Sequence, residues 1–150
     1  MSLAKRIFIV ALFSVACLPN QNTREMHPLQ NKVSIFTQVL SKDSQVLGFH
    51  LQVIYDLHRD KLARYEELYG KRYHLVSKEL VRREAIVVTR SIVQKYSLRD
   101  FLKWENKTGK FSVIAEEIRY KLRIALKEKV LQLQSFSIEK IDFPSSRSSR

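Results

Sequence analysis

The feature that most constrains this chain is an alternation of apolar and polar residues through two neighbouring stretches, 33–39 and 47–57. A period of two is typical of a β-strand that buries one face. A polar cluster at residues 41–44 separates the stretches, and its Ser and Asp side chains can hydrogen-bond their own backbone and close a turn. The pattern therefore predicts a β-hairpin with one apolar face. Its apolar positions are Val33, Ile35, Val39, Leu47, Phe49, Leu51, Val53, Tyr55 and Leu57.

The rest of the chain must cover that face, because a lone hairpin is only marginally stable in water. Apolar residues recur every three or four positions over 62–69, 81–96 and 114–126, which predicts helices there. A capping box, Ser97 with Asp100, predicts a further helix from Leu98 to about residue 108. Alternation returns at 133–143 and shifts register after Ile138, which predicts a last strand with a β-bulge. The order predicts an α+β domain: a small antiparallel sheet, the hairpin plus the C-terminal strand, backed by three to four helices.

Residues 1–17 have the layout of an export signal. Lys5 and Arg6 precede an apolar run at 7–13, which is too short to cross a bilayer, since a membrane helix needs about 20 apolar residues. Ala16 before Cys17 is similar to a bacterial lipoprotein cleavage box, although that box usually has Leu where Ser14 stands. Two interpretations stay open: Cys17 becomes a lipid anchor, or the leader stays uncleaved as a membrane anchor. Residues 18–31 are then expected to form a polar tether.

The charge balance of the chain is strongly basic. It carries 27 Lys and Arg against 15 Asp and Glu, a formal charge of +12 over 150 residues. Such an excess suits nucleic acid or an anionic membrane surface, but it also arises when basic residues cover solvated helix faces. Their even spread favours solvated faces, as with Arg82, Arg83 and Arg90 on one predicted helix. Aromatic residues do not interleave regularly with basic ones, so we expect no nucleic-acid partner.

No motif for catalysis or cofactor binding stands out. The sequence has no phosphate-binding loop, no Gly-x-Ser-x-Gly and no His-Glu-x-x-His, and its three glycines leave little material for a phosphate cradle. Adjacent glutamates at 66–67 and 116–117 diverge on a helix and cannot act as an acid–base couple. The single cysteine excludes an internal disulfide, and no partner stands at metal-ligand spacing from the four histidines, His27, His50, His58 and His74. The sequence predicts no enzyme and no catalytic, cofactor-binding or metal-binding residue.

Four segments, in order, resemble the SPFH or band-7 domain of stomatins, prohibitins, flotillins and bacterial membrane-protease modulators. Residues 41–55 are similar to the family's strand pair, which ends in Val-x-Phe-x-Leu-x-Val-x-Tyr, and residues 65–73 to its short helix that closes in Gly before a Tyr. Residues 90–97 resemble Arg-x-hydrophobic-hydrophobic-x-x-Tyr-Ser, and residues 114–144 its inner helix and a strand ending in Phe-Pro. We therefore expect residues 32–144 to form the domain and residues 145–150 a disordered basic tail.

The resemblance implies a non-catalytic, membrane-anchored scaffold or modulator that organises membrane proteins or regulates a membrane protease. The leader-like pattern of residues 1–17 predicts that it lies on the exported face of a bacterial membrane. The implied partners are membrane lipid and membrane proteins, with weak self-association at the membrane. Relatives continue into a long coiled coil, whereas this sequence ends soon after Pro144, so we expect a shortened form. Two alternatives stay open: an envelope lipoprotein with a structural role, or a basic nucleic-acid-binding module.

Overall fold

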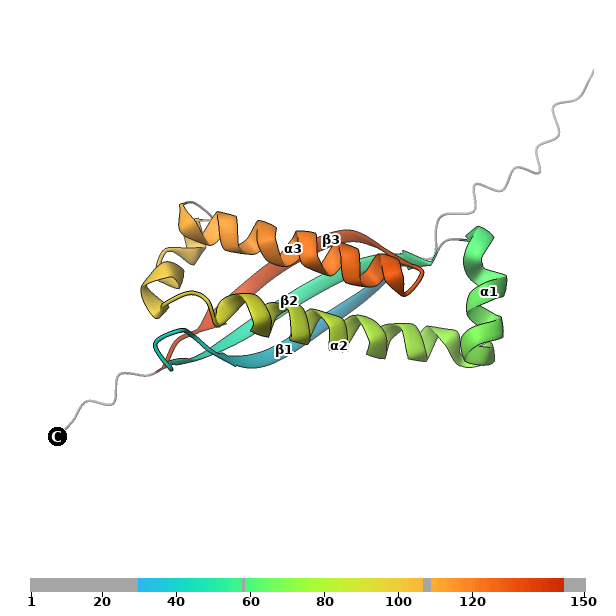
Figure 1. The fold of residues 1–150 in the computed structure, drawn as a ribbon, viewed down its shortest axis with the longest axis horizontal. Helices are drawn as coiled ribbons and strands as arrows, with labels where there is room; N and C mark the ends of the chain where they lie inside the picture. Colours follow the sequence, from blue (N-terminus) through green and yellow to red (C-terminus); the bar gives the residue numbers. More distant parts are fainter. Residues whose placement is uncertain (1–29, 58, 107–108, 145–150) are drawn as a thin grey trace, which may run out of the picture.

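The computed structural model describes residues 30–57, 59–106 and 109–144. Helices α2 and α3 lie over one face of a three-stranded sheet, and α1 lies across one end of it (Figure 1). The elements are β1 (Gln30–Leu40), β2 (Val46–Leu57), α1 (Arg59–Tyr69), α2 (Tyr73–Val93), α3 (Lys110–Glu128) and β3 (Leu131–Asp142), with short 3₁₀ turns at Gly70–Arg72, Leu98–Phe101 and Trp104–Asn106. The predicted α+β fold, a small antiparallel sheet backed by helices, is confirmed.

The predicted hairpin forms the first two strands of the sheet. β1 and β2 pair antiparallel along the whole of β1, and β3 pairs antiparallel with the other side of β2, which makes β2 the central strand. In the turn, the Ser41 hydroxyl donates to the Asp43 carboxylate at 2.5 Å, and Ser44 has a positive φ of 60°. The Asp43 carboxylate also accepts the Leu98 backbone N–H at 3.1 Å, which ties the turn to the helical layer.

The core lies between the sheet and the helices. The apolar residues of the alternating pattern are buried in β1 and β2, and each helix turns its apolar stripe toward them. Burying one large aliphatic or aromatic side chain contributes about 1.5–3 kcal/mol before entropy is counted, so this layer is the main source of stability. The buried residues of the α2 and α3 stripes include Val81, Ala85, Val88, Ile92, Ile114, Ile118, Leu122 and Leu126.

Helix α2 is shifted toward the N-terminus relative to the prediction. It begins at Tyr73, because Tyr73 and Ser77 continue the four-residue spacing of its buried stripe backward from Val81. It ends at Val93, so Tyr96 lies beyond the helix, where its hydroxyl donates to a carboxylate of α3 at 2.9 Å.

The segment after α2 also differs from the prediction. The capping box forms, with Asp100 accepting the Ser97 backbone N–H at 2.9 Å, but it opens a four-residue 3₁₀ turn instead of a longer helix. This tight turn directs Phe101 into the core, where its ring meets Phe49 edge-on with centroids 5.7 Å apart. The core contact therefore ends the helix early.

Strand β3 forms one edge of the sheet and carries two irregularities. Its pairing with β2 jumps from Ile138 to Lys140 and passes over Glu139, which confirms the bulge predicted after Ile138. A second register shift passes over Gln134, which the alternation did not reveal. Bulges bend an edge strand and increase its twist.

The predicted leader with Cys17, nearly all of the predicted tether and the predicted basic tail lie outside the described residues. The described chain starts at Gln30, which with Asn31 already belongs to β1, so the strand begins two residues before the predicted domain boundary at residue 32.

Candidate functional site

The face of the sheet opposite α2 and α3 carries a small charged cluster. His50 Nε2 lies 2.7 Å from one oxygen of the Asp142 carboxylate, and Lys140 Nζ lies 2.6 Å from the other. Hydrogen bonds from Lys140, first, and His50, second, lower the pKa of Asp142 below its ordinary value of 3.8. The Phe36 ring packs on His50 with centroids 4.8 Å apart. Across the described residues, no group of three or more His, Cys, Asp or Glu side chains is placed to hold a metal ion.

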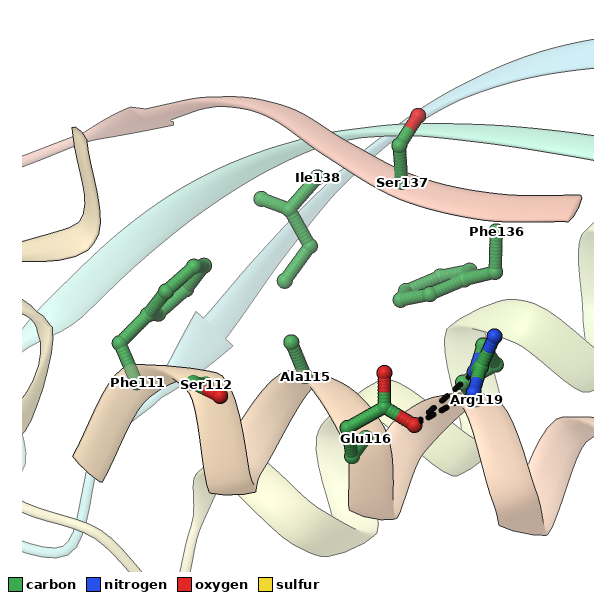
Figure 2. Close-up of a pocket in the computed structure, with 8 residues that line it drawn as sticks. All are labelled: Phe111, Ser112, Ala115, Glu116, Arg119, Phe136, Ser137 and Ile138. Carbon is green, nitrogen blue, oxygen red and sulfur yellow. Dashed lines mark hydrogen bonds and ion pairs between the residues drawn. The ribbon is translucent and has the colours of Figure 1, made fainter. Parts of the chain in front are cut away.

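A first groove, here named the α3–β3 groove, lies between α3 and the edge strand β3. Figure 2 shows Phe111 and Ala115 of α3 directed toward Ile138 and Phe136 of β3, and Arg119 under the Phe136 ring. The groove holds about 210 Å³. Its full lining is Phe111, Ser112, Ala115, Glu116, Arg119, Phe136, Ser137 and Ile138.

The α3–β3 groove exists because a small residue stands where α3 faces β3. Ala115 has a single methyl group, so the space between Phe111 and Phe136 stays open. At the rim, Arg119 Nη2 and Glu116 Oε2 form an ion pair of 2.7 Å, which places charge beside an apolar floor. An edge strand also presents backbone groups that no neighbouring strand satisfies. The arrangement can accept an extended segment that contributes one apolar side chain.

A second groove, here named the end groove, lies where α3 ends and β3 begins. Lys61 of α1 and Arg123 and Lys127 of α3 line it, together with residues 130–134. It holds about 490 Å³, and its three charged lining residues are all cations. All three side chains are exposed. The end groove is therefore suited to an anion.

The arginines that the sequence placed on one helix face lie on the exposed side of α2. Arg82 pairs with Glu79 at 3.0 Å, and Arg83 lies 3.7 Å from Glu84. Carboxylates thus offset part of the charge on this helix, as expected for a solvated face.

The other residues singled out in the sequence are separated by the fold. His50 belongs to the charged cluster with Lys140 and Asp142 on the sheet face opposite the helices, here named the open-face cluster, and His74 is exposed on α2. Cys17, His27 and His58 lie outside the described residues. Glu116 pairs with Arg119, while its neighbour Glu117 faces away and accepts Lys95 at 3.1 Å. Lys95 and then Tyr96 lower the pKa of Glu117 through hydrogen bonds. The two grooves were not predicted, because each is formed by side chains from different elements that only the tertiary fold brings together.

The described residues define a class of protein: a small α+β domain whose helices cover one face of a three-stranded sheet and whose edge strand β3 lines two grooves. The family model described as SPFH domain / Band 7 family matches residues 16–149, and the chain therefore belongs to this family. Among curated proteins no match is found. The family generally consists of membrane-associated, non-catalytic scaffolds and modulators. None of the described helices is both long and apolar enough to cross a membrane.

Proposed function

We propose that this protein is a non-catalytic scaffold that is held at a membrane and either organises membrane proteins or regulates a membrane protease. Membership of the SPFH family over residues 16–149 supports the scaffold role. The basic and apolar pattern of residues 5–17 supports attachment, through a lipid on Cys17 or through an uncleaved leader. The similarity of that pattern to a bacterial lipoprotein leader favours the exported face of a bacterial membrane.

The observation that carries the protein-binding role is the α3–β3 groove (Figure 2). Its proposed occupant is an extended segment of a membrane protein. The backbone of that segment pairs with β3 between the two bulges, along residues 135–138, and one apolar side chain enters the space above Ala115. Recognition through backbone pairing and one pocket needs no catalytic residue, which agrees with the general character of the family.

Filling the groove tests this role. Ala115→Trp places an indole in the space between Phe111 and Phe136, while Val113→Trp adds the same group to an exposed position of the same helix. Each full-length variant is crosslinked in membranes, and the captured proteins are identified by mass spectrometry. We expect Ala115→Trp to lose partners that wild type and Val113→Trp retain. Equal capture by all three proteins would refute binding in this groove.

The attachment is tested separately by sedimentation with membranes and by metabolic labelling with a fatty-acid analogue. If Cys17 is the lipid anchor, wild type is labelled and Cys17→Ala is not. If the leader stays uncleaved, wild type sediments with membranes but carries no label. A wild-type protein that stays soluble would refute both forms of attachment.

A further inference from the structure

The end groove lies at the same end of the domain as the start of the first strand. Gln30, the first residue of β1, pairs with Asp56 near the end of β2, and the next residue, Leu57, pairs with Leu131 at the start of β3. Helix α1 begins at this end too, and α3 finishes there (Figure 1). The chain therefore passes from residues 1–29, which hold the predicted anchor, into the domain close to the end groove.

The charge of the end groove has one sign. Lys61, Arg123 and Lys127 line it, and no acidic residue is among the described residues of its lining. Lys127 stands in the last turn of α3, so part of its charge offsets the negative end of the helix dipole. Lys61 and Arg123 lie outside that last turn and add cationic charge that the helix end does not need.

The backbone at the end groove is strained. Val130, which connects α3 to β3 and lines the end groove, has a φ of +65°. A β-branched residue rarely adopts this left-handed conformation, which usually falls to Gly or Asn at a helix C-terminus. Strain of this kind is concentrated at binding sites, where a geometry is kept for a ligand at the expense of stability.

We propose that the end groove binds the phosphate headgroup of an anionic membrane lipid, so that this end of the domain faces the bilayer. The inference rests on the proposed attachment of residues 1–17 and adds the orientation of the domain and the lipid class that it selects. Phosphate matches the groove because Lys and Arg head groups donate hydrogen bonds to its oxygens and neutralise its charge. Cations held near an anionic surface strengthen binding by about fivefold each at physiological salt.

The test compares two triple variants with the same change in net charge. The end-groove variant removes the three positive side chains of the groove lining through Lys61→Gln, Arg123→Gln and Lys127→Gln. The α2 variant removes three positive side chains from helix α2 through Arg82→Gln, Arg83→Gln and Arg90→Gln. The full-length proteins are titrated with vesicles of phosphatidylcholine and with vesicles of equal parts phosphatidylcholine and phosphatidylglycerol. All six side chains are exposed, and thermal unfolding followed by circular dichroism verifies that both variants fold.

We expect wild type and the α2 variant to bind the phosphatidylglycerol vesicles more tightly than the neutral ones. The end-groove variant should lose roughly 25- to 125-fold of affinity for the anionic vesicles, at about fivefold for each of two to three cations, and keep its affinity for the neutral vesicles. An equal loss in both variants would assign the preference to net charge and overturn the proposal, as would a wild type without any preference. Failure to bind either kind of vesicle would instead overturn the membrane attachment itself.

Competition with soluble glycerol phosphate distinguishes binding of a lipid headgroup from binding of a free phosphate compound. If the bilayer headgroup is the ligand, glycerol phosphate at the same phosphate concentration leaves vesicle binding almost unchanged, because only the vesicle combines the headgroup with the anchor. Release of the wild-type protein by glycerol phosphate at that concentration, with no release of the end-groove variant, would identify a soluble phosphate ligand and overturn the lipid proposal.

Discussion

Successive side chains of β2 point to opposite faces of the sheet, and the two faces have different environments. Phe49 is 0% exposed and touches the Phe101 ring, whereas the side chain of the next residue, His50, is 40% exposed beside Asp142. Both residues belong to the same paired backbone, so strand pairing cannot account for the difference. The difference comes from α2 and α3, which cover one face only (Figure 1). Burial against the helices stabilises the fold, whereas the other face stays partly open to solvent.

The open face is not uniformly exposed, which refines the comparison. At the end where β1 starts, Asp56 is only 6% exposed and accepts the Gln134 side-chain amide at 2.6 Å. At the opposite end, Gly48 is buried beneath the side chains of Phe36 and Asp142. Local contacts between neighbouring strands can therefore bury single residues without a covering layer.

The largest effect should come from the covered face. Phe49→Ala removes a fully buried ring and its edge-on contact with Phe101, and the surrounding helices cannot close the resulting cavity completely. We expect a loss of about 3–5 kcal/mol in the free energy of unfolding, measured by urea denaturation.

The matched control is the adjacent substitution on the open face. His50→Ala deletes a half-exposed side chain whose main contacts are an ion pair with Asp142 and the Phe36 ring. Its expected cost is below about 1 kcal/mol, as for other solvent-facing changes. Equal costs at positions 49 and 50 would show that something also covers the second face.

A smaller difference in stability should distinguish two buried tyrosines that differ, within the described part of the chain, in the hydrogen bonding of their hydroxyls. The Tyr55 hydroxyl donates to Ser77 Oγ at 3.0 Å, and Ser77 donates in turn to the His74 carbonyl at 2.9 Å. The Tyr65 hydroxyl is buried with no hydrogen-bond partner among the described residues, and burial raises the pKa of both tyrosines. We expect Tyr55→Phe to cost about 1 kcal/mol and Tyr65→Phe to be neutral or stabilising, again by urea denaturation. The reverse order would mean that the Tyr65 hydroxyl has a partner in solution.

The sequence predicted the parts of this comparison that depend on local pattern. Alternation identified the buried face of the hairpin, and the register change after Ile138 located a bulge, because both follow from the side-chain period of a strand. The capping box at Ser97 was predicted correctly, but the length of the following helix was not, since Phe101 packs on a strand about fifty residues earlier.

The grooves could not be predicted in this way. Lys61 and Arg123 line one groove although they are separated by most of the domain, and no periodicity connects them. Ala115 sits in an ordinary amphipathic helix, and only its position opposite β3 turns a small side chain into an opening. Sites of this kind depend on tertiary packing, and the sequence pattern describes each element alone.

A still smaller effect is expected at Gly48 on the open face. A Cβ atom at this position would lie 3.1 Å from the Phe36 ring and 3.2 Å from Asp142 Cβ, closer than ordinary contact. Because Phe36 is largely exposed, its ring can move aside, and we expect Gly48→Ala to cost less than about 1 kcal/mol. The cost should fall further in a Phe36→Ala background, as a double-mutant cycle would show. A loss as large as that of Phe49→Ala would mean that this part of the open face is rigidly packed.

The smallest expected effect is a dependence of stability on pH that arises on the open face. Lys140 and His50 lower the pKa of Asp142 in the folded protein, so the ionised carboxylate stabilises the fold at any pH above the unfolded value near 3.8. That contribution is lost as the pH falls through the lower folded value. Asp142→Asn removes it and should make the decline of the unfolding midpoint between about pH 5 and pH 2 less steep.

Carboxylates on the helical side provide the contrast. The pKa values of Asp100 and Glu117 are also lowered, chiefly by Lys110 and by Lys95, so part of the acid sensitivity must remain in Asp142→Asn. The Asp142 side chain is partly exposed to solvent, so its contribution to the acid sensitivity of the unfolding midpoint should shrink when salt screens its ion pairs. A variant whose midpoint falls with pH as steeply as that of wild type, at low and at high salt, would show that the open-face cluster does not affect folding.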